Sequence, residues 1–167
     1  MNATHEPIQI YVGTYAKYNS GSIEGAWLDC EDYSSKEEFL EACAELHKDE
    51  SDPEFMYQDY EGFPKRYYSE SGIDSELWDT YLKVDADERE AFEAYLSIFD
   101  GDYDDFRDRY QGEFKNEEDF AYEFLESTGE LNSIPENLRY YFDYKAFARD
   151  LFLDGYTMEN GHVFYTY

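Results

Sequence analysis

Five aspartates lie close together in the segment FDGDYDDFRDRYQGEF, which begins at Phe99: Asp100, Asp102, Asp104, Asp105 and Asp108. An EF-hand calcium loop needs acids at positions 1, 3 and 5, a glycine at position 6 and a bidentate glutamate at position 12. Counted from Asp100, the acids at the start of the loop fit, but position 6 is Asp105 and position 12 is Gln111. Because both discriminating positions fail, the spacing argues against a calcium loop.

The same segment fits an amphipathic helix. Tyr103, Phe106 and Tyr110 recur at i, i+3 and i+7, so one face of a helix can bury all three. The aspartates then point towards water. We therefore interpret the run as an acidic helix surface rather than as a cation site.

A second possible metal site combines Cys30 with Cys43 and His47, the last two at i and i+4 on one predicted helix. These residues lack the paired CxxC spacing that would make a zinc site specific. Cys43 falls on the apolar stripe of that helix, so a buried core thiol is the favoured interpretation. With no secretion signal visible, we expect both cysteines to be free thiols in a reducing cytoplasm.

Motifs of the common catalytic and cofactor sites are absent. The sequence contains no GxxxxGK[ST], GxGxxG, HExxH or GxSxG pattern. It has 41 acidic residues, so chance pairs of carboxylates are inevitable and a glycosidase pair stays open. We expect a protein that is not an enzyme and has no cofactor. The alternative is an acidic calcium-binding or carboxylate-dependent carbohydrate-active protein.

Negative charge dominates the composition. The 41 acids face 13 lysines and arginines, and the net charge of −28 is spread as −11 over residues 1–60, −8 over 61–103 and −9 over 104–167. Aromatic residues make up 20% of the chain, so a core can form and the charge must lie on its surface. Such a field repels nucleic acid and attracts basic protein surfaces. Adaptation to high salt would also give an acidic surface, but so large an aromatic content does not resemble a uniform surface adjustment.

Three further classes of protein are disfavoured. No apolar run of 18 residues exists, so no membrane span is predicted. The start, MNATHEPIQI, lacks the features of a signal peptide, and we expect a cytoplasmic protein. Basic clusters are limited to Lys65-Arg66 and the pair Arg107 and Arg109, which argues against direct nucleic-acid binding.

Residues 1–62 are predicted to form an N-terminal ββαβ domain. Ser34 or Ser35 can cap a helix over residues 36–48, whose apolar positions form one stripe. Runs of β-branched and aromatic residues predict the strands. These are expected at residues 7–18, 26–30 and 54–62.

Residues 63–103 are predicted to form a central helical domain. One helix is expected over residues 75–82, and Asp85 with Glu88 makes a capping box for a helix over 87–99.

Residues 104–167 are predicted to form a C-terminal α+β domain. Asn116 can cap a helix over residues 117–127, and Pro135 can begin another over 136–155. Asn160-Gly161 favours a type I′ hairpin turn. Together the segments predict an α+β fold: an elongated chain of small domains, with an N-terminal ββαβ unit, a central helical bundle and a C-terminal mixed α/β-hairpin domain.

The outward acids of the predicted helices form stripes. Acids three residues apart on a helix rise about 4.5 Å, close to the axial phosphate step of about 3.4 Å on one DNA strand. At the charge density of duplex DNA, 28 net charges correspond to roughly 48 Å of duplex, or about 14 base pairs. A rigid body with such stripes could occupy a DNA-binding groove, but acidic stripes alone are a generic feature. The candidate residues of such a surface are Asp87, Glu90, Glu93, Asp100, Asp102, Asp104, Asp105, Asp108, Glu117, Glu118, Asp119, Glu123 and Glu126.

Three segments of the chain closely resemble the ArdA antirestriction proteins: IYVGTYAKYNSGSIEGAWLD at 10–29, DPEFMYQDYEGFP at 52–64 and ENLRYYFDYKAFARDLFLDG at 136–155. The similarity runs from about residue 8 to the C-terminus, in order and without large gaps. The resemblance implies a DNA mimic carried on plasmids or conjugative elements such as conjugative transposons. It would occupy the DNA-binding groove of type I restriction-modification enzymes and protect incoming mobile DNA. It also implies an elongated homodimer joined largely through the C-terminal part.

Overall fold

The computed structural model describes residues 6–167 and combines helices with two small three-stranded sheets. The chain divides into two compact units, with the boundary between Ala86 and Asp87. The mixture of helices and antiparallel sheets agrees with the predicted α+β class. The finer division into three domains, with boundaries after residues 62 and 103, stays a prediction.

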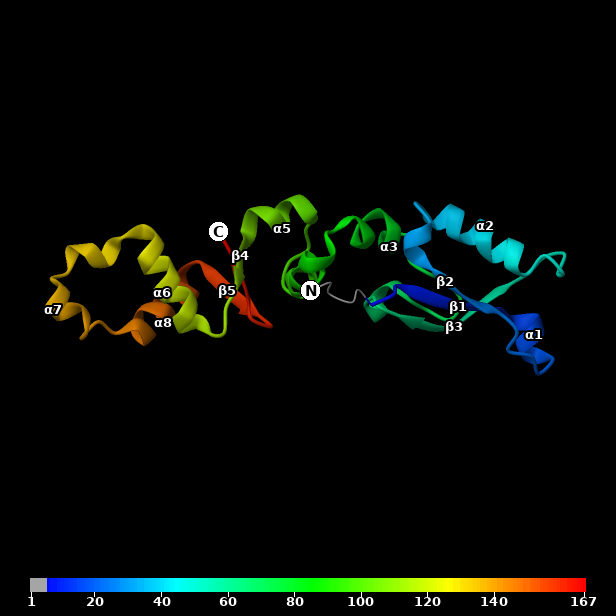
Figure 1. The fold of residues 1–167 in the computed structure, drawn as a ribbon, viewed down its shortest axis with the longest axis horizontal. Helices are drawn as coiled ribbons and strands as arrows, with labels where there is room; N and C mark the ends of the chain where they lie inside the picture. Colours follow the sequence, from blue (N-terminus) through cyan, green and yellow to red (C-terminus); the bar gives the residue numbers. More distant parts are fainter. Residues whose placement is uncertain (1–5) are drawn as a thin grey trace. The chain divides into compact units, whose positions relative to one another are not determined.

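The first unit is built on an antiparallel sheet with the strand order β2-β1-β3 (Figure 1). Its strands are β1 (Gln9–Thr14), β2 (Ala26–Asp29) and β3 (Phe55–Glu61). Ile10 and Val12 alternate towards the core, where they join Phe39 and Cys43 of helix α2 (Lys36–Leu46). The side chain of Ser35 caps α2, as predicted, and the strands and α2 follow one another as β1, β2, α2 and β3, with one further short helix between β1 and β2.

The predicted first strand is too long, because β1 ends at Thr14 and residues Tyr15–Asn19 form helix α1. The Thr14 hydroxyl accepts a 3.2 Å hydrogen bond from the backbone N–H of Lys17, which begins the helix. The β-branched and aromatic residues of this segment favour a strand, but the N-cap at Thr14 begins a helix instead. A 3-10 helix, Cys30–Asp32, follows β2 in the same unit.

The predicted helix over residues 75–82 is broken into α3 (Glu76–Asp79) and a 3-10 helix, Tyr81–Lys83. The backbone leaves the helical region at Thr80, where φ is −126° and ψ is −64°. Packing explains the break: the Trp78 indole donates a 3.0 Å hydrogen bond to the carbonyl of Cys30, while the Tyr81 ring lies 5.4 Å from that of Tyr67. Tyr67 belongs to a further 3-10 helix, Lys65–Tyr67.

The second unit contains an antiparallel sheet with the order β4-β6-β5. The predicted hairpin is confirmed as β5 (Tyr156–Glu159) and β6 (His162–Tyr165). Its turn has positive φ at both Asn160 (50°) and Gly161 (82°), as a type I′ turn requires. Strand β4 (Tyr110–Glu113) was not predicted, because a four-residue strand interrupted by an irregular register at Gly112 has no clear alternation.

Two helices of the second unit precede β4. Helix α4 (Arg89–Leu96) is shorter than the predicted helix over 87–99 and follows a 3-10 helix, Ala86–Glu88. The predicted capping box is wrong, since α4 has no side-chain cap and Glu88 accepts a hydrogen bond from the Tyr103 hydroxyl instead. Helix α5 (Tyr103–Arg109) begins with Asp102 as its side-chain cap.

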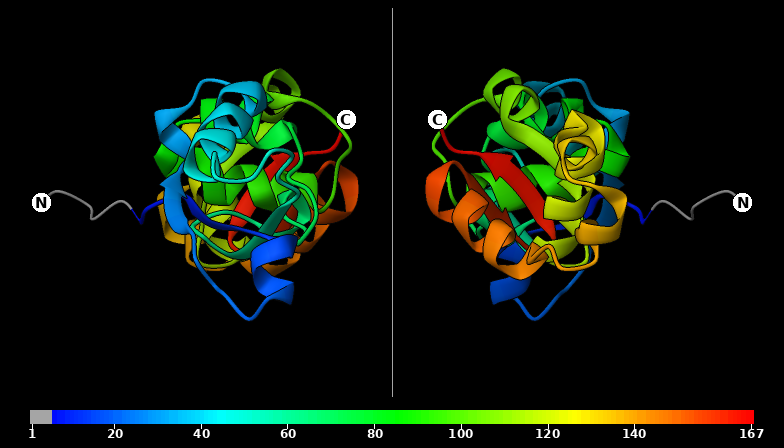
Figure 2. Two further views of the ribbon diagram at one scale, coloured as in Figure 1. Left: turned by 90° about the vertical axis from the view of Figure 1, so that its right-hand side faces the viewer. Right: turned by 90° about the vertical axis from the view of Figure 1, so that its left-hand side faces the viewer.

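The remaining helices lie between β4 and β5 in sequence. Helix α6 (Glu117–Thr128) starts at the predicted Asn116 cap and ends at Gly129, where φ is 69°. After a 3-10 helix, Glu130–Ser133, the predicted helix over 136–155 is two helices, α7 (Glu136–Arg139) and α8 (Tyr144–Asp154). They separate because the Asp143 carboxylate accepts a 3.0 Å hydrogen bond from Ala146 N–H and so begins α8. Figure 2 shows α8 in orange beside the red hairpin.

Aromatic side chains make the core that supports the acidic helices. Phe92 of α4, Phe106 of α5 and Phe164 of β6 are almost completely buried. The rings of Phe92 and Phe106 are 5.5 Å apart, and those of Phe106 and Phe164 are 6.2 Å apart. Each contact joins two elements, so the aromatic residues fix the helices whose outer faces carry the acids.

Candidate anionic surface

All thirteen predicted surface acids lie in the second unit. Asp87 is in the 3-10 turn before α4, and Asp100 is in the loop before the Asp102 cap. The others lie on three helices: Glu90 and Glu93 on α4; Asp104, Asp105 and Asp108 on α5; Glu117, Glu118, Asp119, Glu123 and Glu126 on α6.

Most of these side chains face solvent. Glu93 and Asp105 are half-buried, and the other eleven are exposed: Asp87, Glu90, Asp100, Asp102, Asp104, Asp108, Glu117, Glu118, Asp119, Glu123 and Glu126. The aromatic core therefore displays these eleven carboxylates outwards, as the helical periodicity predicts.

Helix α6 shows the stripe most clearly. Asp119, Glu123 and Glu126 recur at i, i+4 and i+7, so they share one face, while Phe120 and Leu125 are buried. At 1.5 Å per residue, successive acids on this stripe rise about 6 and 4.5 Å. The steps are of the same order as the axial phosphate step of one DNA strand, about 3.4 Å. The stripe therefore presents three carboxylates at axial steps about 1.3 to 1.8 times that phosphate step.

The acidic run at residues 100–108 is a capped helix. Residues from Tyr103 to Arg109 form α5, and the Asp102 carboxylate is engaged by Asp105 N–H at 2.9 Å. A calcium loop would need this backbone to wrap around an ion, so the geometry agrees with the failed EF-hand spacing. Phe106 is 1% exposed, and Asp104 and Asp108 share the opposite, exposed surface.

Asp105 differs from its neighbours because its carboxylate has two internal partners. It accepts hydrogen bonds from the Tyr95 hydroxyl and from Arg109 Nε, the latter at 2.8 Å. The Tyr95 hydroxyl and then Arg109 lower the pKa of Asp105. The same contact, together with burial as the larger cause, raises the pKa of Tyr95. The Asp105 carboxylate therefore binds two side chains within the protein, while part of it remains accessible to solvent.

Arg109 is held in an aromatic and carboxylate enclosure that sequence reasoning missed. Its guanidinium carbon lies 4.7 Å from the centre of the Phe99 ring and 4.1 Å from that of the Tyr167 ring. One guanidinium nitrogen also donates a 3.0 Å hydrogen bond to the carbonyl of Tyr165. The enclosure neutralises and covers a positive charge on the helix that bears the acidic run.

Glu90 lies above a buried histidine. His162 Nε2 is 3.8 Å from the Glu90 carboxylate, and Nδ1 is 2.8 Å from the Tyr110 hydroxyl. The His162 side chain is 4% exposed, whereas that of Glu90 is 79% exposed. Because Glu90 and His162 are far apart in the sequence, no local pattern predicts that they lie close together.

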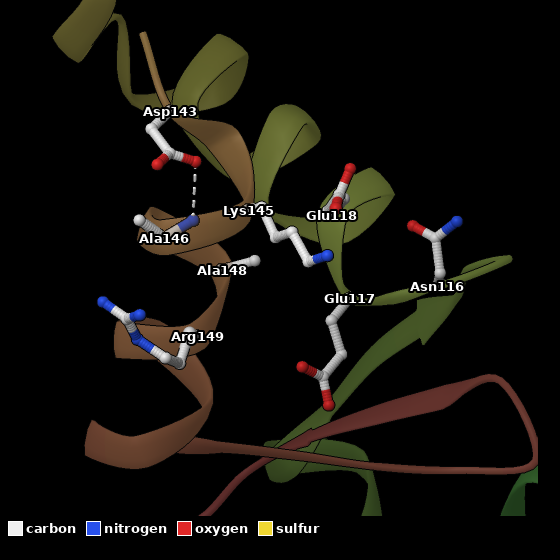
Figure 3. Close-up of a pocket in the computed structure, with 8 residues that line it drawn as sticks. All are labelled: Asn116, Glu117, Glu118, Asp143, Lys145, Ala146, Ala148 and Arg149. Atoms are coloured by element: carbon white, nitrogen blue, oxygen red, sulfur yellow. Dashed lines mark hydrogen bonds between the residues drawn. The ribbon is translucent and has the colours of Figure 1, made fainter.

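Two of the predicted acids line a hollow of mixed charge, shown in Figure 3. Glu117 and Glu118 of α6 and Lys145 and Arg149 of α8 line a space of about 620 Å³; Figure 3 shows the Lys145 side chain reaching towards α6, whereas the Arg149 guanidinium points away from the two acids. The acids lie in the first turn of α6, where they also interact favourably with the helix dipole. This part of the candidate surface is less uniformly negative than the stripe further along α6.

The thiols behave as core residues. Cys30 and Cys43 are free and buried, and burial raises the pKa of Cys43 to about 12. Within residues 6–167 they do not gather with His47 into a set of metal donors; His47 instead groups with Asp49 and Glu50.

An internal cation fills the group formed by His47, Asp49 and Glu50. The Lys17 ammonium donates hydrogen bonds to His47 Nδ1 at 2.8 Å and to Asp49 at 2.9 Å. It also lies 3.6 Å from the Glu50 carboxylate. Because His47 Nε2 donates to the carbonyl of Val12 at 3.0 Å, Nδ1 is the ring nitrogen that accepts from Lys17. The group therefore anchors α1 to the loop after α2.

The structure is that of a small α+β protein with a strongly acidic surface. Comparison with protein families gives a match over residues 10–164 to the family described as Antirestriction protein (ArdA). The chain therefore belongs to the ArdA family of antirestriction proteins. No curated protein matches the sequence significantly. Among the described helices, none is long and apolar enough to cross a membrane.

Proposed function

We propose that this antirestriction protein acts as a mimic of B-form DNA. It would occupy the DNA-binding groove of type I restriction-modification enzymes, and the working surface would be the exposed acids of the second unit. The observation that carries the proposal is the display of eleven exposed carboxylates on and around helices backed by an aromatic core. The rigid core behind the acids favours binding, because carboxylates that are already held in place lose little conformational entropy when a partner binds.

The charge balance supports a long anionic surface. Residues 1–86 contain 20 acidic and 6 basic residues and residues 87–167 contain 21 and 7, so each unit carries −14. Several of the basic side chains are paired internally, including Lys17 with Asp49 and Arg109 with Asp105. A field of one sign steers the protein towards a basic groove and repels nucleic acid.

We further propose that the protein is a homodimer joined through the C-terminal part. Three large side chains in and just after α7 are exposed: Leu138 by 50%, Tyr140 by 89% and Tyr141 by 77%. An apolar hollow of about 540 Å³ opens in the same region, lined in part by Leu131, Ile134, Phe142 and Phe147. Large exposed apolar groups beside an apolar hollow favour association with a second copy.

The biological role proposed is protection of incoming mobile DNA, such as a plasmid or conjugative transposon, in the cytoplasm of the recipient cell. The protein needs no catalytic residue or cofactor for this role, because inhibition by occupancy involves no bond making. The alternatives of a calcium-binding or carbohydrate-active protein have no observation in their favour, since α5 is helical where a calcium loop would bend.

The test is competition for a purified type I restriction-modification enzyme on labelled duplex DNA. The protein is titrated at fixed salt beside an unrelated acidic protein of similar charge. We expect displacement of DNA at stoichiometric concentrations by this protein and not by the control. Displacement by neither protein, or by both only in large excess, would contradict mimicry and leave only generic charge.

A further inference from the structure

The outer face of the sheet in the first unit carries an aromatic pair beside a carboxylate. Since Ile10 and Val12 point into the core, Tyr11 between them points to the opposite face. The strand register places Trp27 of β2 opposite Tyr11 on one side and Asp59 of β3 on the other. Directly opposed residues share a face, so these three side chains form a row across the sheet.

A second row lies beside the first. Gln9 is opposed by Asp29 of β2 and by Glu61 of β3. The Gln9 amide donates a 2.7 Å hydrogen bond to the Glu61 carboxylate. Because the two rows are two residues apart along β1, they are separated by roughly 7 Å. Carboxylates therefore lie within one side-chain length of the aromatic row.

The aromatic pair is held in place yet accessible. The rings of Tyr11 and Trp27 meet edge to face, with centres 5.5 Å apart and planes at 72°. The Tyr11 hydroxyl donates a 2.6 Å hydrogen bond to the carbonyl of Ile23. Trp27 remains 38% exposed and Ile23 71% exposed. A binding partner would meet a preformed aromatic surface rather than mobile side chains.

Each of the nearby carboxylates keeps acceptor capacity. Asp29 accepts a hydrogen bond from Glu31 N–H at 2.9 Å, and Asp59 accepts one from Tyr60 N–H at 2.8 Å. A carboxylate has several lone-pair positions, so these contacts orient the groups without saturating them. A planar cation that stacks on aromatic rings and forms paired hydrogen bonds with carboxylates suits such a surface, and arginine has both properties.

The protein already binds one of its own arginines by this combination. Arg109 lies against the Phe99 and Tyr167 rings at 4.7 and 4.1 Å, and Asp105 accepts its Nε–H at 2.8 Å. The outer face of the first sheet offers the same chemical groups to a guanidinium from outside.

We propose that this face, defined by Tyr11, Trp27, Asp29, Asp59 and Glu61, is a docking surface for an arginine side chain presented by a protein partner. Charge complementarity identifies the partner's chemistry, because the unit carries −14 and the rows add aromatic faces to the carboxylates. The inference goes beyond mimicry of phosphates, since phosphates offer no aromatic contact. Taking the restriction enzyme as the partner rests on the proposed function.

Trp27 itself can report binding. The chain has two tryptophans, and Trp78 is 2% exposed, so the two indole N–H signals in a nitrogen-proton correlation spectrum separate an exposed reporter from a buried reference. The probe is a blocked Gly-Arg-Gly tripeptide, with Gly-Lys-Gly as the charge control. We expect a saturable shift of the Trp27 signal with the arginine peptide, at least threefold weaker binding of the lysine peptide, and threefold weaker binding in Asp59→Asn. Equal responses to both peptides, or none, would overturn the proposal.

A second measurement repeats the competition assay with Trp27→Ala and the matched control Tyr18→Ala. Tyr18 is 52% exposed on α1 of the same unit, and both changes leave the net charge at −28. We expect about fivefold more Trp27→Ala than wild type for half-displacement of DNA, and no change for the control. Wild-type potency in Trp27→Ala would overturn the docking surface but leave mimicry intact. If the wild type fails to displace DNA, the proposed function fails and the tripeptide titration alone decides the docking surface.

Discussion

Arg109 Nε donates a 2.8 Å hydrogen bond to the Asp105 carboxylate one turn earlier on α5, and the two side chains are only 15% and 32% exposed. The pair ties the acidic run to the end of β6 and the residues after it, because Arg109 also donates to the carbonyl of Tyr165 and stacks on Tyr167. The positively charged Arg109 side chain thus helps to hold together a part of the protein whose surface is negatively charged.

Replacing Arg109 by methionine should destabilise the second unit by about 1–3 kcal/mol, because the Asp105 carboxylate and the Tyr165 carbonyl lose a charged donor. Lys115→Met removes the same charge from an exposed position and is the matched control. Urea unfolding of both variants measures the difference. Equal stability of the two variants would show that the enclosure contributes nothing beyond its charge.

The pH dependence of Asp105→Asn follows from the lowered pKa of Asp105. A carboxyl whose pKa is lower in the folded state adds stability above its unfolded pKa, about 3.9, and that contribution is lost as pH falls through the folded pKa. The stability difference between wild type and Asp105→Asn should therefore be full at pH 6 and shrink below about pH 4. Thermal melts of both proteins across this range provide the measurement. A constant difference down to pH 2 would contradict the assignment.

Salt should stabilise the fold. With a net charge of −28, self-repulsion opposes the compact state, and the Debye length shortens from about 30 Å at 0.01 M to about 8 Å at 0.15 M salt. The melting temperature should rise over this interval, and association with the enzyme should slow as steering is screened. A melting temperature that falls, or an association rate that ignores salt, would argue against these two roles of the charge.

The stripe on α6 can be separated from bulk charge by two triple variants. One changes Asp119→Asn, Glu123→Gln and Glu126→Gln on α6; the other changes Glu37, Glu41 and Glu45 to glutamine on α2 of the first unit. Both sets are exposed and both remove three charges.

The α6 variant should require at least about fivefold more protein to displace DNA from the enzyme, by loss of three fixed contacts of up to about 1 kcal/mol each. The α2 variant should lose less. Equal losses would mean that total charge, and not the predicted surface, sets potency.

The exposed tyrosines of the α7 region give a test of self-association. Tyr141→Ser should weaken the proposed dimer by about tenfold or more, as expected when an aromatic anchor is removed from an interface. Tyr18→Ser, at a position 52% exposed on the first unit, is the control. Sedimentation over a range of concentrations distinguishes the two. A wild-type protein that stays monomeric at high concentration would refute the dimer directly.

Local signals predicted the elements that local chemistry decides. Asn160-Gly161 fixed the hairpin turn, and Asn116 fixed the start of α6, because each residue acts on its immediate backbone. Periodicity also predicted correctly that Phe106 would be buried, but Tyr103 is only half-buried, and Tyr110, expected on the same helix face, is half-buried on β4. The acids that share its helix could therefore be assigned to the surface from sequence alone.

Contacts between distant residues explain what the sequence did not reveal. Strand β4 exists because Tyr110 pairs with Phe164, and the role of His162 depends on Glu90 and Tyr110. The start of α8 could have been predicted, since Asp143 is a favourable N-cap residue. The apolar periodicity continues across this position, however, and indicated one long helix. The arginine-binding rows on the first sheet needed the strand register, which composition does not supply.

The central position of β6 in the second sheet has a consequence for synthesis of the protein. Strand β4 pairs only with β6, whose residues are translated roughly 50 positions later. At ordinary rates of translation, β4 waits about 3–10 s for its partner. During that interval α5 and α6 lack the sheet that joins them, so every acid of the stripe has been translated before the sheet beneath the acidic helices can form.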